Sequence, residues 1–110
     1  TGYGGLAFEE EAKRCCQQLA GPNKKVLIMC HHGVMVIGEN VADAFNRLFY
    51  FERAAETYIK ALWTRQTLRV LSDEIAEKTA TELENYPAQA DGHFAELKAI
   101  LDSEEPDYAT

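Results

Sequence analysis

The sequence predicts an α/β fold with two strands and about four helices. Two short apolar runs, rich in β-branched residues, lie between Val26 and Gly38 and flank the polar break His31-His32-Gly33. Each run has the length and hydrophobicity of a buried strand. An apolar stripe with helical spacing follows from Val41 to about Gln66, which predicts roughly 39 Å of helix at 1.5 Å per residue.

Composition limits the size and the partners of this fold. The chain has 110 residues, 46% of them hydrophobic, and a formal net charge of −7. That length fits one domain or less, and that hydrophobic content favours a packed core over disorder. Because phosphate binding needs a basic surface, the charge argues against nucleic acid and against an anionic membrane surface. No apolar run reaches the roughly 18 residues of a membrane helix.

The cysteines indicate a reducing compartment. Cys15, Cys16 and Cys30 are an odd number, and the first two are sequence neighbours that make poor disulfide partners. Together with the lack of a charged-then-apolar start, this predicts a cytoplasmic location. Cys30 ends an apolar run, so we expect a buried, inert thiol there, with a reactive thiol beside His31 as the alternative.

The rest of the chain reads as helices joined by short connectors. Asn40 and Ser72 are good N-caps for two helices. Asp43 follows in the first turn after Asn40, and Asp73 and Glu74 follow in the first turn after Ser72. In chain order we expect a loop over Thr1–Gly5, a helix over Phe8–Ala20, a helix after Ser72 that stops at Tyr86-Pro87, a loop over Ala88–Gly92, a helix from about His93 to Leu101, and a solvated acidic tail over Ser103–Tyr108.

The long helix has an apolar face too broad for one hairpin to cover. Its aromatic residues are predicted to be core rather than a cofactor site; they are Phe45, Phe49, Tyr50, Phe51 and Tyr58. A two-stranded sheet is marginal alone, and its edges are open. We therefore expect the chain to self-associate or to need further chain to complete the sheet.

The polar break between the strands is the candidate site. Two adjacent imidazoles held between buried strands suit a metal or catalytic site, whereas an ordinary hairpin turn with hydrogen-bonded histidines is the alternative. Gly33 lets the backbone turn where a side chain would clash. The third histidine, His93, lies at a predicted helix start among polar residues, so we expect it to be solvated.

These motifs resemble the C-terminal half of the class II aldolase/adducin family. Members of that family carry an apolar strand, Asn-His-Gly, a second apolar strand ending in Gly, and a long helix that opens with Ala-Phe; Val26–Gly38 and Asn40–Phe45 follow that order. Phe51–Ala54 resembles a Leu-Glu-Arg-Ala stretch, and Leu71–Thr79 resembles an acidic-capped helix of bacterial members. The resemblance is strongest from about Gly5 to Lys78.

The resemblance implies a partial domain and an incomplete metal site. Residues 1–110 would be the C-terminal portion of one class II aldolase-like α/β/α sheet domain. His32, which precedes Gly33, would be one of three zinc ligands, and His31 stands where the family has Asn. The family's other two ligands come from a His-x-His motif that this chain lacks, so no catalytic residue is assigned here and the chain alone is expected to be inactive.

Two functions follow from the resemblance. The parent protein would be a zinc-dependent lyase or epimerase acting on small hydroxy-carbonyl or sugar-phosphate substrates, with the missing N-terminal half and further copies of itself as partners. The alternative is a non-catalytic, adducin-like interaction module that keeps the fold without the chemistry. The presence of His-x-His in the parent would distinguish the two.

Overall fold

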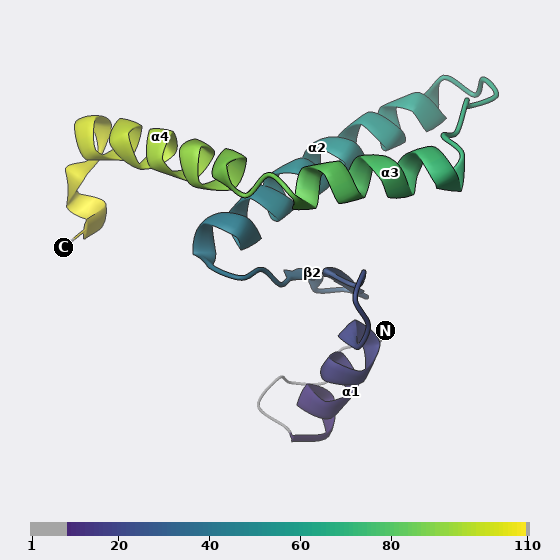
Figure 1. The fold of residues 1–110 in the computed structure, drawn as a ribbon, viewed down its shortest axis with the longest axis horizontal. Coiled ribbons are helices and arrows are strands. Elements are labelled where there is room, and N and C mark those ends of the chain that lie inside the picture. The colour runs from purple at the N-terminus through teal and green to yellow at the C-terminus, as the bar shows by residue number, and fades with distance from the viewer. Residues whose placement is uncertain (1–8, 110) are drawn as a thin grey trace. The chain divides into compact units, whose positions relative to one another are not determined.

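The computed structural model describes residues 9–109, which divide into one unit ending at Glu39 and a second beginning at Asn40. Within this range lie four α-helices and a two-stranded antiparallel sheet (Figure 1), as the sequence predicted. The predicted loop over Thr1–Gly5 and the start of the first helix at Phe8 lie outside the described residues. The elements are α1 Glu9–Leu19, β1 Val26–Met29, β2 Gly33–Val36, α2 Val41–Trp63, α3 Asp73–Glu84, α4 Ala88–Glu104 and the 3₁₀ helix η1 Pro106–Ala109.

The first unit is built from α1 and the β1–β2 hairpin. Three glutamates occupy the first turn of α1, where the helix dipole favours negative charge. The helix ends before Gly21, whose φ of 128° suits glycine. Helix α1 contacts β1, and Cys15 and Leu27 are the buried side chains of this unit among the described residues. Cys15 is thus a packing residue, whereas its neighbour Cys16 is exposed.

Helix α2 opens the second unit with the predicted cap. The Asn40 side chain accepts a hydrogen bond from the Asp43 N–H at 2.9 Å, which satisfies one of the free donors of the first turn. The helix ends at Trp63 rather than at Gln66, because Arg65 adopts a left-handed conformation with φ of 55°.

Helix α3 also begins as predicted, but α4 does not. The Ser72 hydroxyl accepts a hydrogen bond from the Ile75 N–H and caps α3. The loop predicted for Ala88–Gly92 is wrong, because α4 already begins at Ala88. Pro87, with φ of −64° and ψ of −25°, has helical dihedrals and lacks the N–H that a helix start would leave unpaired. Gly92 is accommodated inside the helix.

The second unit is held by the packing of α4 on α2, where Ala90 is buried. Much of its apolar surface remains exposed, including Tyr58, Leu62 and Trp63 at 58%, 48% and 75%. The predicted aromatic core of α2 is therefore only partly formed within this unit.

The acidic tail is exposed, as predicted. No helix in the described part of the chain has the length and the apolar character needed to cross a membrane.

Candidate functional site

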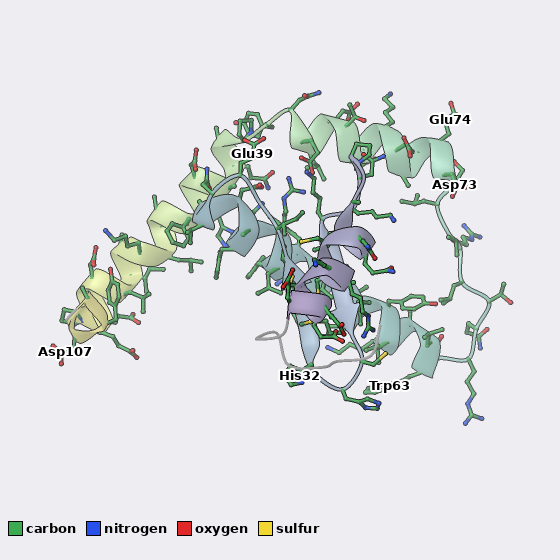
Figure 2. All side chains as sticks on the ribbon, turned by 90° about the horizontal axis from the view of Figure 1, so that it is seen from below. His32, Glu39, Trp63, Asp73, Glu74 and Asp107 are labelled. Carbon is green, nitrogen blue, oxygen red and sulfur yellow. The ribbon has the colours of Figure 1, made fainter. Side chains whose placement is uncertain are left out.

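The histidine pair lies in the turn of the hairpin. Strands β1 and β2 pair in the register Val26↔Val36 to Met29↔Gly33, which leaves Cys30, His31 and His32 as the connection. The His32 N–H donates to the Met29 carbonyl at 3.2 Å and closes the turn. Both histidines are exposed, and Figure 2 labels His32 at the tip of the hairpin. The turn fixes the backbone on which these two side chains are mounted.

The backbone at His31 has a conformation that asparagine also adopts readily. His31 has φ of 65°, in the left-handed region, and Gly33 has φ of 126°. Asn, Asp and His are the non-glycine residues that adopt this region most readily. A histidine at position 31 therefore preserves the turn that an asparagine would form. At Gly33 the constraint is conformational, since an added Cβ would have no neighbouring atom within 4 Å.

The residues described do not form a complete zinc site around His32. A catalytic zinc needs about three protein ligands and one open position. Within residues 9–109, no group of three or more histidine, cysteine, aspartate or glutamate side chains is arranged to hold a metal ion. His32 would thus need two ligands from outside this part of the chain, and the assignment of His32 as a ligand remains a prediction.

The environment of Cys30 differs from the prediction. Strand β1 ends at Met29, so Cys30 belongs to the turn and its side chain is exposed rather than buried. The described cysteines form no disulfide. The sequence pattern placed Cys30 in the strand because the apolar run continues through it, whereas the turn of the hairpin needs three residues.

The third histidine lies in an aromatic cluster between α2 and α4, which consists of Phe45, Phe49, Tyr50, His93 and Phe94. The His93 ring centroid lies 4.7 Å from that of Phe49 and 5.7 Å from that of Phe45. His93 Nδ1 is hydrogen-bonded to Asn46 Oδ1 at 3.0 Å, and Gln89 Nε2 donates to the Tyr50 hydroxyl at 3.2 Å. The prediction of a solvated His93 is therefore wrong: the side chain is half-buried and joins two helices.

An open groove runs along α2 beside this cluster. It is lined by Phe45, Leu48, Phe49, Glu52, Arg53 and Glu56. The Arg53 guanidinium lies 5.6 Å from the centre of the Phe49 ring, a cation–π arrangement. Glu56 is paired with Lys60, and this hydrogen bond lowers the pKa of Glu56. The groove thus has an apolar floor and a charged rim.

An arginine joins the start of α2 to the end of α3. Arg47 donates to both carboxylate oxygens of Glu84, at 2.5 and 2.7 Å, and to Asp43 at 3.0 Å. The hydrogen bond to Glu84 is the main reason that the pKa of Arg47 is raised. The i,i+4 spacing of Asp43 and Arg47 favours their pair within α2, whereas the partner on α3 is 37 residues away in the sequence.

Comparison with known proteins identifies the family. The family model described as Class II Aldolase and Adducin N-terminal domain matches residues 2–59. The protein hu-li tai shao of Drosophila melanogaster is 34% identical over 101 residues, which are 91% of this chain and 9% of that protein. Human gamma-adducin is 37% identical over 60 residues, and human beta-adducin is 38% identical over 56 residues.

These matches cover different shares of the proteins compared. The two human adducins match 54% and 50% of this chain and 8% of their own lengths. The chain therefore spans less than a tenth of these curated relatives. No solved structure matches it. Because the family model covers more than half of the chain, including the hairpin and most of α2, the chain belongs to the class II aldolase and adducin N-terminal domain family.

Proposed function

We propose that this chain is part of a non-catalytic, adducin-like interaction module. The observation that carries the proposal is the similarity to adducins and to hu-li tai shao, the latter extending over 91% of the chain. That match extends well past residue 59, where the family model ends. We infer that the helices after the hairpin belong to the same kind of protein.

The surface of the second unit supports an interaction role. Tyr58, Ile59 and Leu62 are each about half exposed, and Trp63 is more exposed still. Exposed apolar patches of this kind mark sites of protein–protein contact. The missing N-terminal half of the domain and further copies of the protein are the partners that we propose for this patch on α2. A reducing, cytoplasmic location is part of the same proposal, on the basis of the odd cysteine count.

An enzymatic parent is the second candidate. It is favoured by the position of His32 directly before Gly33 in a closed hairpin turn, where the family pattern has a zinc ligand. Such a zinc would polarise the oxygen of a small hydroxy-carbonyl or sugar-phosphate substrate. A lyase or epimerase of this kind would need two further ligands and an acid or base from the rest of the protein.

Zinc measurement separates the two candidates. The interaction module predicts that the longer protein, purified without chelator and dialysed, contains no stoichiometric zinc, with or without the His32→Ala substitution. The enzyme predicts about one zinc per chain, lost in His32→Ala and retained in His93→Ala, because His93 is committed to Asn46 and the aromatic cluster. Stoichiometric zinc that depends on His32 would overturn the proposal.

A further inference from the structure

We infer that helix α3 is a docking surface for a basic, amphipathic helix of another protein; the inference rests on the proposed interaction role and names its partner class. The first observation is exposure: every residue of α3, from Asp73 to Glu84, is exposed. Ile75 and Leu83, the largest apolar side chains of the helix, are 52% and 58% exposed. Within residues 9–109, no other element covers the apolar face of this three-turn amphipathic helix.

The position of α3 beside α2 leaves that face accessible. At its last turn α3 is tied to α2 by the two hydrogen bonds between Arg47 and Glu84, and at its start it follows a connector without regular secondary structure (Figure 1). The apolar face of α3 consists of Ile75, Ala76, Thr79, Ala80 and Leu83. On a helical projection of about 100° per residue, Glu84 lies roughly 110° from the centre of this face. The side of α3 that is tied to α2 is therefore not the apolar side.

The charges around the apolar face select the occupant. Asp73 and Glu82 lie roughly 90° to either side of the centre of this five-residue face. Both rims are therefore acidic. Lys78, the single basic residue of α3, lies farther round the helix than Glu82. Figure 2 shows Asp73 and Glu74 projecting from the start of α3. An amphipathic helix with lysine or arginine beside its apolar stripe would place opposite charges along both rims.

A second copy of the chain is a poorer match. Each copy has a net charge of −7, and two α3 helices packed face to face would bring the acidic rims together. Like charges opposed across an interface weaken association and suppress the wrong partner. An anionic membrane surface is disfavoured for the same reason. A partner for the α3 face must supply both an apolar surface and positive charge, and a basic amphipathic helix supplies both.

Binding of a designed peptide tests this inference. The probe is a 14-residue amphipathic helix of leucine, alanine and lysine, with a matched peptide in which glutamate replaces lysine. We expect the full 110-residue chain to bind the lysine peptide in calorimetric titration and not the glutamate peptide. Amide chemical shifts of Ile75, Thr79 and Leu83 should move on binding, whereas those of the hairpin should not.

Two pairs of variants distinguish docking on α3 from attraction to an acidic protein. The variant Ile75→Ala with Leu83→Ala keeps the charge and should lower the affinity about tenfold, because it removes the apolar anchors; the control Ile100→Ala with Leu101→Ala changes exposed residues of α4 instead and should have no effect. The variant Asp73→Asn with Glu82→Gln should lower affinity about threefold. Its control, Glu96→Gln with Glu104→Gln, removes the same charge from α4 and should be neutral.

The peptide-binding experiments and the zinc measurement test different claims and can fail independently. Alanine is a better helix former than isoleucine or leucine, so loss of binding in the first variant does not report unfolding of an exposed helix, and circular dichroism checks this. Equal effects of the α3 and α4 variants, equal binding of the two peptides, or self-association abolished by Ile75→Ala with Leu83→Ala would overturn the inference. Those results leave the proposed function standing, whereas zinc held by His32 would overturn that function instead.

Discussion

Truncation of Phe49 tests whether the aromatic cluster holds α4 on α2. The Phe49 ring contacts Tyr50 at 5.4 Å and His93 at 4.7 Å between ring centroids, and it stacks with Phe45 at 6.5 Å. Replacing a fully buried phenylalanine by alanine costs about 3–5 kcal/mol. Phe49 is half-buried, so we expect Phe49→Ala to cost about 2 kcal/mol, with the lost ring pairs included in that figure.

Hydrogen exchange of the α4 amides measures this cost locally. A loss of about 2 kcal/mol corresponds to roughly thirtyfold faster exchange, since every 1.4 kcal/mol is tenfold. The matched control is Tyr58→Ala on the same helix, whose side chain is 58% exposed and should change α4 exchange less than about twofold. Equal acceleration by the two variants, or no acceleration by Phe49→Ala, would refute the packing of α4 on α2 through this cluster.

Three further predictions concern the turn, the α2–α3 link and the C-terminal end. In the hairpin, His31→Asn should be neutral or slightly stabilising, whereas His31→Val should cost about 1–2 kcal/mol, because the backbone at position 31 is left-handed. Unfolding in urea, monitored by the amide NMR signals of β1 and β2, measures the stability of both variants. Arg47→Lys loses the bidentate contact with Glu84 and should destabilise the attachment of α3 by about 0.5–1 kcal/mol. Amide hydrogen exchange should then be faster in α3 and unchanged in α4. Unchanged amide exchange in α3 would contradict the link. The hydrogen bond from the Tyr108 hydroxyl to Asp102 at 2.6 Å raises the pKa of Tyr108. The contribution of this hydrogen bond to stability is therefore present below the ordinary pKa of tyrosine and is lost as pH rises through the raised value. Ring NMR signals of Tyr108 should titrate at lower pH in Asp102→Asn than in the parent chain.

Features set by local sequence were predicted well. Asn40 and Ser72 cap their helices because a short polar side chain reaches an N–H three residues ahead, which depends on no distant contact. The two strands followed from apolar runs flanking a polar break. The start of α4 was missed because Tyr86-Pro87 was interpreted as a stop followed by a loop, whereas Pro87 has helical dihedrals and α4 begins directly after it.

Features set by distant contacts were not predictable in this way. His93 meets Asn46, which is 47 residues away in the sequence, and nothing in the polar surroundings of His93 along the chain indicates that contact. Glu84 pairs with Arg47 across 37 residues. The exposure of Cys30 was not predictable for a different reason. The hairpin register decides whether the last residue of an apolar run belongs to the strand or to the turn.

The residues of the candidate site were identified from the sequence, but their backbone conformation was not predicted. Gly33 and the histidine pair indicated a turn, and the family resemblance supplied the role of His32. The left-handed backbone of His31 explains why asparagine suits that position, and it does so without reference to a metal. The turn is thus required by the hairpin in enzyme and interaction module alike.

The most direct test of the proposed interaction module is the zinc content of the longer protein, of which we propose this chain is a part. Inductively coupled plasma mass spectrometry of the dialysed protein and of its His32→Ala variant gives zinc per chain for each. The interaction module predicts far less than one zinc per chain in both, with unchanged folding of the variant. One zinc per chain in the parent protein that disappears in His32→Ala would contradict it and establish His32 as a ligand of a metal-dependent enzyme.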